Sequence, residues 1–387
     1  MIDNKQTAKH LIALLGAELL GNVFTETLSQ EEIKEIYTLS KAHDLAHVAG
    51  DALARAGLLR GEAVKAFQKW QYLALYRYQR VAYELSELRR VLCEEKIPFM
   101  PLKGTVLREH YPDPAMRTSV DIDILVRPEH LERVKNLLIE KLSYRFDVAE
   151  GHDIGFFAPS ELHVEIHFAL CDENDKRTLA LGSPWESASL KDGSDYEYEM
   201  TNEFFYAYAM AHAAKHFYVG GCGIRPFMDM VVMRNAMPCD KETLEKLYEK
   251  TGLTAFAEYA EKLCDYWFFG ADSDETILFM EEYLLAGGAY GTLEGYVASI
   301  QGDKGGAYYF WRKLFLPYKS MKKQFPVLEK CPILLPFCHV ARWFAIVFSS
   351  RRQKAAAQMK ASQSLDGEKT KKIVNLQRKL KLDERLK

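Results

Sequence analysis

The sequence lacks several features that would place the protein in a specialised class. Its seven cysteines are an odd, scattered set without any Cys-x-x-Cys pair. This pattern argues against a disulfide scaffold and a structural zinc site, and it favours reduced thiols in a cytoplasm. Charge of one sign is not in excess either, because 51 basic and 54 acidic residues give a formal net charge of −3. The whole chain therefore does not indicate a nucleic-acid partner.

Long apolar runs are also missing. The most apolar stretch, residues 332–348, is interrupted by Pro336, His339 and Arg342, and it is shorter than the ~20 residues of a membrane-spanning helix. We predict a buried C-terminal helix here, with an interfacial helix backed by the basic tail as the alternative. The N-terminus lacks a secretory signal, because Glu18 interrupts its mildly apolar segment and no small-residue cleavage site follows. A cytoplasmic protein without a membrane span is expected.

The 387 residues are enough for two or three domains. Helical periodicity precedes and follows a central stretch in which strands alternate with helices. We therefore predict an α+β fold with a mixed sheet. Its regions are an N-terminal helical region (1–95), an α+β core (96–200), a helical C-terminal domain (201–350) and a basic tail (351–387). The tail has twelve Lys or Arg against four Asp or Glu, and we expect it to be solvated, partly helical and mobile.

Residues 120–126 have the pattern of a strand that carries two aspartates. Side chains alternate along a strand, so Asp121 and Asp123 share one face while the apolar residues between them take the other. Two carboxylates about 7 Å apart on a buried strand are unfavourable unless a cation lies between them. Oxygen ligands of this kind suit Mg²⁺, especially when substrate phosphates complete its coordination.

A two-metal site for phosphoryl transfer needs a third carboxylate nearby. Residues 161–168 alternate apolar side chains with His163, Glu165 and His167, which is typical of a strand with one polar face. Glu165 lies in the middle of that face. We predict that it joins Asp121 and Asp123 in one triad.

A tight turn precedes the aspartate strand. Gly104 lets the backbone turn after a short strand at 97–102, and the N–H groups of the following helix could meet a phosphate. Lys103 would add a point charge to that phosphate. Arg117 is either an exposed turn residue or a guanidinium that neutralises phosphate charge.

These motifs together resemble the DNA-polymerase-beta-like nucleotidyltransferase superfamily, and more narrowly its uncharacterised bacterial nucleotidyltransferase family. The family pattern is a lysine–glycine pair, the Tyr111-Pro112-Asp113 triplet, an arginine and then Asp-x-Asp. The segment from His212 to Asp229 resembles the family's second-domain signature. The resemblance extends from the helices before Ile97 to roughly Arg351. One departure is Gly104-Thr105, where the superfamily has a Gly-Ser pair.

The resemblance implies a two-metal nucleotidyltransferase that moves an NMP group from an NTP, ATP in the first place, to an unidentified small-molecule or protein acceptor. Two Mg²⁺ ions would be held by Asp121, Asp123 and Glu165, which are also the candidate catalytic residues. We expect Asp123→Asn to abolish turnover. The fold should stay intact, because removing one of two buried like charges should not destabilise the metal-free protein. The candidate nucleotide-binding residues are Lys103, Gly104, Thr105, Arg117, Ser119, His212, His216 and Asp229.

Several alternatives stay open. His212 and His216 are four residues apart on one helical face, a spacing used by zinc sites, but no third ligand is visible and hydrogen-bonded histidines at a domain interface are favoured. The glycine-rich 287–291 segment has no strand before it, so it lacks the context of a phosphate loop. The protein could also be a non-catalytic nucleotide-binding protein of this fold, or an RNA-modifying enzyme whose basic tail grips phosphates. The tail has no aromatic residues for stacking on bases, so nucleic acid is not favoured.

Overall fold

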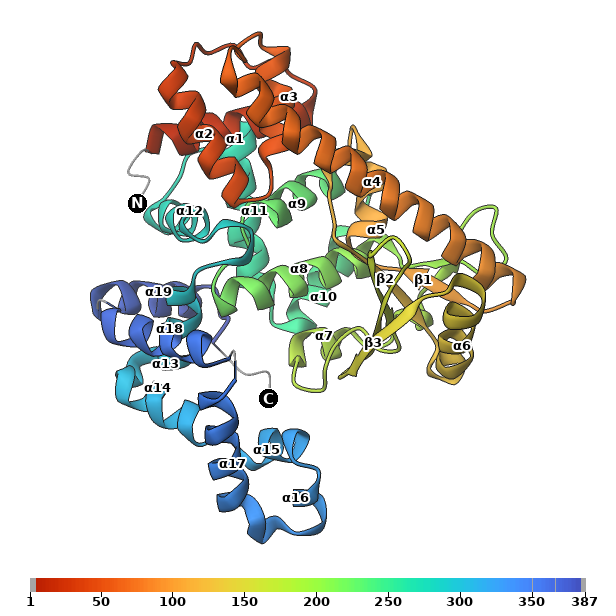
Figure 1. The fold of residues 1–387 in the computed structure, drawn as a ribbon. Helices are drawn as coiled ribbons and strands as arrows, with labels where there is room; N and C mark the ends of the chain where they lie inside the picture. The colour runs from red at the N-terminus through yellow and green to blue at the C-terminus, as the bar shows by residue number, and fades with distance from the viewer. Residues whose placement is uncertain (1–4, 350, 366, 384–387) are drawn as a thin grey trace.

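Four helices lead into the central sheet in the computed structural model, which describes residues 5–349, 351–365 and 367–383 (Figure 1). They are α1 (Lys5–Leu20), α2 (Gln30–Ala42), α3 (Ala46–Arg55) and the long α4 (Glu62–Glu94). A capping box begins α2, because the Ser29 side chain accepts from the Glu32 N–H while the Glu32 carboxylate accepts from the Ser29 N–H. The predicted residues 1–4 of the N-terminal region lie outside the described residues.

The sheet has five strands in the order β1-β2-β5-β4-β3. Only β2 and β5 pair in parallel, and the other neighbours are antiparallel, so the predicted mixed sheet and α+β class are confirmed. The elements of this region are β1 (Phe99–Pro101), α5 (Gly104–Leu107), β2 (Asp121–Val126), α6 (Leu131–Leu142), β3 (Arg145–Glu150), β4 (Asp153–Phe157) and β5 (His163–His167).

One face of the sheet is covered by α4 and α6. Ile122 and Ile124 of β2 are fully buried there against apolar residues of both helices, among them Leu88 and Val134. The apolar residues of the β2 pattern therefore face the helices. Asp121 and Asp123, which alternate with them, face the opposite side of the sheet.

Helices α8 and α9 lie on that opposite side, where their residues line a cavity together with Asp121, Asp123 and Glu165, whereas α13 to α19 lie farther from the sheet (Figure 1). These C-terminal helices are given below. They follow a short connection of α7 (Lys176–Leu181), β6 (Ser189–Leu190) and β7 (Tyr198–Glu199). Helices α8, α9 and α11 contribute to one large apolar core together with α1 and α3. The helices are α8 (Asn202–Val219), α9 (Arg225–Ala236), α10 (Lys241–Thr251), α11 (Thr254–Phe269), α12 (Glu275–Gly287), α13 (Leu293–Gln301), α14 (Gly305–Leu314), α15 (Tyr318–Gln324), α16 (Val327–Lys330), α17 (Leu335–Val347), α18 (Arg351–Ser364) and α19 (Gly367–Lys379).

Two predictions for the C-terminal end are wrong in part. The tail is partly helical as expected, with α18 and α19, but it is not wholly solvated, because Ile373, Leu376 and Leu380 are buried in the large core. Although the tail is rich in lysine, α19 has an apolar face, and this face packs into the large core. The apolar run at 332–348 does form a helix, but Cys338 and His339 are the only buried residues of α17. Residues 350, 366 and 384–387 lie outside the described residues.

Among the described residues, no helix is long and apolar enough to cross a bilayer. The longest apolar candidate from the sequence, around α17, is only 13 residues long as a helix.

Buried histidines predict how stability depends on pH. His47 of α3 is 4% exposed, its Nε2–H donates to the Met116 carbonyl oxygen at 3.1 Å, and burial lowers its pKa from 6.5 to about 4. The unfolded chain therefore binds a proton in this range that the folded chain does not, so stability is lost as the pH falls from 6.5 towards 4. We expect a loss of roughly 3 kcal/mol from this residue.

Urea unfolding of the wild type and His47→Gln at pH 7, 5.5 and 4 measures the effect. The variant retains an N–H donor but cannot titrate, so its stability should fall less steeply with acidity. His110→Gln, at an exposed position, is the control. Its free energy of unfolding should depend on pH as steeply as that of the wild type. Equal slopes in all three proteins would contradict the assignment.

Candidate functional site

The register between β2 and β5 brings the predicted acids to one face of the sheet. Asp123 lies opposite Glu165 and Asp121 lies opposite His163 in this parallel pair. Partners in register point to the same side, so all these polar side chains face α8. Asp123, Glu165 and His167 each offer a potential ligand atom, and these atoms lie within 4.8 Å of one another. The structure thus gathers carboxylates from two strands, as the strand alternation predicted.

Asp123 is buried between two cationic groups. Its Oδ1 accepts from Lys103 Nζ at 3.1 Å and from His167 Nε2 at 2.8 Å, and the residue is only 4% exposed. Burial opposes ionisation of Asp123, but Lys103 and His167 outweigh it and hold its pKa well below the usual range. Burial likewise opposes the His167 imidazolium, whose pKa Asp123 and Glu165 raise to about 9.

Asp121 has a different environment on the same strand. Burial, followed by the charge of the Asp123 carboxylate, raises the pKa of Asp121 from 3.8 to about 6. No hydrogen bond compensates the Asp121 carboxylate in the same way as Lys103 and His167 compensate Asp123. The half-buried Glu165 completes the group, with its Oε2 3.3 Å from His167 Nε2. Two carboxylates that repel one another, with a third beside them, form a donor set suited to a hard divalent cation.

The turn before α5 contributes the Lys103 ammonium group to the site. Lys103 adopts a positive φ of 49° and sends its ammonium group to Asp123. The Thr105 and Val106 N–H groups donate to the Leu102 and Lys103 carbonyl oxygens, so they do not take part in the predicted phosphate contact. A Cβ on Gly104 would come within 3.4 Å of Arg117 Nη1. This is an ordinary van der Waals distance, so Gly104 lies in direct contact with the Arg117 side chain.

Arg117 is held from one side by α9. Its Nε donates to Asp229 Oδ1 at 2.7 Å, and the Tyr111 hydroxyl donates to the same oxygen at 2.7 Å. The side chains of Arg117 and Asp229 are 13% and 9% exposed. Asp229, which the sequence analysis predicted as a nucleotide-binding residue, orients Arg117, and the arginine is not an exposed turn residue.

These groups line a cavity of about 410 Å³ between the sheet and helices α8 and α9. All the predicted site residues contribute to its wall: Lys103, Gly104, Thr105, Arg117, Ser119, Asp121, Asp123, Glu165, His212, His216 and Asp229. They come from segments more than 100 residues apart in the chain. The wall is completed by apolar residues of α8 and α9 such as Phe205 and Met233.

His212 and His216 lie side by side on α8, with ring centroids 4.5 Å apart. Burial, followed by the positive charge of Lys103, lowers the pKa of His212 well below its usual value. Neither residue belongs to a cluster of three potential metal ligands among the described residues. The geometry favours neutral histidines in the cavity wall over a zinc site at this helix.

Several residues of the site were missed by the sequence analysis. Asp44 accepts from Arg225 at 2.7 Å and from Arg77 at 3.0 Å beside the cavity, and Tyr290 reaches its rim from the glycine-rich 287–291 turn. That turn packs backbone to backbone against Gly220, because a Cβ on Gly291 would overlap the Gly220 carbonyl group. These contacts join residues that are 33 to 181 positions apart in the chain, and they leave no local signal. His167 did leave one, since it continues the polar alternation of β5.

Comparison with known proteins identifies one family. A family model described as "uncharacterised nucleotidyltransferase" matches residues 29–269. The match confirms the resemblance found in the motifs, although it ends well before Arg351, the predicted limit. No curated protein and no solved structure matches the chain.

The buried ion pair between Arg117 and Asp229 predicts a stability effect. Asp229→Asn leaves the Arg117 guanidinium buried without a counter-charge, and we expect a loss of about 3 kcal/mol in the free energy of unfolding. The control is Asp265→Asn, which breaks the ion pair of Asp265 with Arg234. This pair is exposed: the Arg234 side chain is 40% exposed and the Asp265 side chain is 45% exposed. We expect that variant to lose less than about 1 kcal/mol. Urea unfolding measures both, and similar small losses would contradict the proposed burial effect.

Proposed function

The chain belongs to this uncharacterised nucleotidyltransferase family, and from that premise we propose that it transfers an NMP group from an NTP to an acceptor nucleophile within the cavity. The acceptor's O–H or N–H attacks the α-phosphorus, a new bond forms there, and the bond to the β-phosphate oxygen breaks. Pyrophosphate leaves with the electron pair, and the acceptor's proton is released. ATP is the nucleotide we propose first, and the acceptor is a small molecule or a protein side chain.

The observation that supports this function is the convergence of the Asp121, Asp123 and Glu165 carboxylates at one wall of a cavity that is also lined by Lys103, Arg117 and Arg225. The charge conflict between Asp121 and Asp123, seen in the raised pKa of about 6 for Asp121, fits residues that hold divalent cations. We propose Asp121, Asp123 and Glu165 as ligands of two Mg²⁺ ions. Bound Mg²⁺ would neutralise charge on the triphosphate and make the acceptor group more acidic.

The remaining residues would bind and orient the substrates. Lys103 is paired with Asp123, and its ammonium could turn to the β- and γ-phosphates once cations compensate that carboxylate. Asp229 accepts from Arg117 Nε and the Thr118 carbonyl oxygen accepts from Nη1, so the guanidinium in the cavity wall is oriented before a phosphate arrives. Glu165 is half-buried beside the aspartates and is our candidate to accept the acceptor's proton. Catalysis would come from positioning and charge neutralisation, without a covalent intermediate.

The decisive variant is Asp121→Asn. Removing this carboxylate should abolish turnover, by 100-fold or more on the order expected for lost transition-state stabilisation. It should not reduce stability, because burial and Asp123 already disfavour the ionised form of Asp121 in the fold. The measurements are pyrophosphate release with Mg²⁺ and each of the four NTPs, and thermal unfolding.

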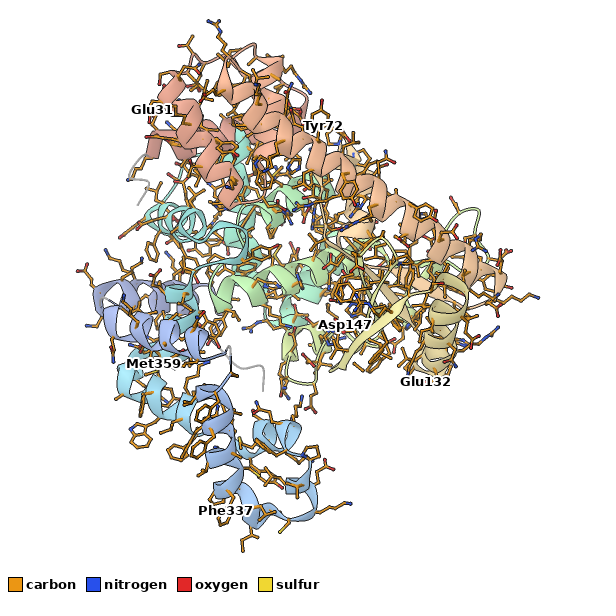
Figure 2. All side chains as sticks on the ribbon, in the orientation of Figure 1. Glu31, Tyr72, Glu132, Asp147, Phe337 and Met359 are labelled. Carbon is orange, nitrogen blue, oxygen red and sulfur yellow. The ribbon has the colours of Figure 1, made fainter. Side chains whose placement is uncertain are left out.

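Asp123→Asn is less informative than the sequence suggested. It would leave Lys103 and His167 without their shared counter-ion, so this substitution is expected to destabilise the protein as well as inactivate it. Glu132→Gln on the exposed side of α6 (Figure 2) is the control and should retain full turnover. Nucleotide binding without any pyrophosphate release would indicate a non-catalytic binding protein. Release that requires RNA and falls steeply with salt would indicate a nucleic-acid acceptor.

A further inference from the structure

A second cluster of potential metal ligands lies at the turn between β3 and β4. His152 is in that turn, and Asp153 begins β4 directly opposite His167 of β5. The rings of His152 and His167 have centroids 5.3 Å apart. One ligand atom from each of His152, Asp153 and His167 lies within 4.8 Å of the others. None of the site residues predicted from the sequence belongs to this cluster.

Two buried ring nitrogens in this cluster have no hydrogen-bond partner among the described residues. His167 is 1% exposed; its Nε2 is engaged by Asp123 and Glu165, whereas its Nδ1 makes no hydrogen bond. The Nδ1 of His152 is also buried without a hydrogen bond, 3.7 Å from both Asp153 Oδ2 and Asp172 Oδ1. A buried polar atom left unpaired costs free energy, so two in one cluster call for an explanation.

The backbone shapes a cradle around the same atoms. Gly151 has a positive φ of 60°, and a Cβ at this position would overlap the Asp172 carboxylate. Glycine before His152 therefore allows Asp172, which lies beyond β5, to approach the turn. The result is a cluster of His152, Asp153 and His167, with the Asp172 carboxylate 3.7 Å from His152 Nδ1.

We propose that His152, Asp153, His167 and Asp172 bind a first-row transition-metal ion, with Zn²⁺ as the best fit. Two imidazole ligands favour zinc over magnesium, which prefers an all-oxygen shell. Tetrahedral ligands at about 2.0–2.2 Å from zinc are separated by roughly 3.3–3.6 Å. The separations of 3.7 Å from His152 Nδ1 to each carboxylate are close to this range. The ligand atoms of His152, Asp153 and His167 lie within 4.8 Å of one another, so metal binding would draw them closer together.

The proposed ion would be linked to Asp123 through a single ring. A metal-bound histidine commonly donates its other N–H to a carboxylate, which fixes the tautomer and the ring orientation. His167 has this arrangement, with Nδ1 towards the cluster and Nε2 2.8 Å from Asp123 Oδ1. Zinc at this position would make His167 a positioning residue for Asp123. The metal site itself does not depend on the proposed nucleotidyl transfer.

Zinc titration tests the proposal directly. Metal-free protein is titrated with Zn²⁺ in competition with a chromophoric chelator, and we expect one tight site per chain. His152→Ala should weaken zinc binding by about 100-fold or more, and Asp153→Asn should also weaken it. Mg²⁺ in excess should not displace the zinc. Circular dichroism checks that both variants fold, and having two variants keeps the test valid if one does not.

Two matched controls separate this site from other histidines. His110→Ala changes an exposed histidine, and His216→Ala removes one of the paired rings on α8; both should bind zinc like the wild type. No tight zinc binding would overturn the proposal. So would binding that is unchanged in His152→Ala and Asp153→Asn, or binding that is lost in His216→Ala instead.

An independent observation concerns the exposed apolar stripe of α17, which the sequence predicted to be buried. Six apolar residues at intervals of three or four lie along one side of residues 333–348, and their exposed fractions range from 42% to 82%. They are Ile333, Phe337, Val340, Phe344, Val347 and Phe348. Figure 2 places Phe337 at the outer edge of the molecule, away from the sheet. Trp311 and Phe315 of the neighbouring α14 stack on each other and are 57% and 46% exposed.

The segment around this stripe is strongly basic. Residues 304–349 contain eight Lys or Arg and one Glu, whereas the whole chain has a net charge of −3. Exposed aromatic residues in a segment rich in lysine and arginine are features of helices that lie in the headgroup layer of anionic membranes. We propose that the stripe of α17, with its basic surroundings, binds an anionic lipid surface without crossing it.

Co-sedimentation with vesicles tests the membrane proposal. Vesicles of phosphatidylcholine with phosphatidylglycerol should sediment the protein, and vesicles of phosphatidylcholine alone should sediment little of it. The double variant Phe337→Ser/Phe344→Ser should lose the binding, while Tyr72→Ser, an exposed aromatic of α4 at 71% exposure, should keep it. No binding to anionic vesicles, or unchanged binding by the double variant, would overturn the proposal. A dimer in sedimentation analysis that the double variant abolishes, without vesicle binding, would assign the stripe to a second copy instead.

Discussion

The site depends on the parallel pairing of β2 with β5. A parallel pair aligns residues that point the same way, so the register that sets Asp123 opposite Glu165 brings the acids of both strands together on one face. A shift of one residue would turn Glu165 towards the apolar layer under α4 and α6. That layer, with Ile122, Ile124, Val164 and Ile166 all buried, holds the register. The hydrophobic core therefore positions the polar site.

Charge compensation differs among the carboxylates, and this difference has structural consequences. Asp123 is stabilised as an anion by Lys103 and His167, whereas Asp121 is destabilised as an anion by burial and by Asp123. The ionised Asp123 therefore stabilises the folded protein, whereas ionisation of Asp121 is unfavourable in the fold. An unfavourable charge of this kind is typical of residues that bind a cation or a substrate. The same buried ring of His167 joins this group to the His152 cluster across β4 and β5.

Residues 270–383 extend beyond the segment that matches the family. Part of this extension contributes to the site, because α12 leads into the turn that packs on Gly220 and brings Tyr290 to the cavity rim. Another part closes the large core through α19. Helix α17 does neither, and its exposed apolar stripe and basic surroundings distinguish it from the rest of the chain.

The sequence alone determined what depends on local periodicity. Alternation along 120–126 and 161–168 identified β2, β5 and the faces of Asp121, Asp123 and Glu165, because the side-chain period of a strand is independent of its neighbours. Helical spacing identified α17 and its apolar content. The tertiary structure decided which apolar faces are covered: α19 docks and the stripe of α17 does not, since burial depends on the partner and not on the helix. It also decided which charges meet, as in the pairs of Arg117 with Asp229 and Lys103 with Asp123. Such contacts join distant segments, and no local pattern encodes the distance between them.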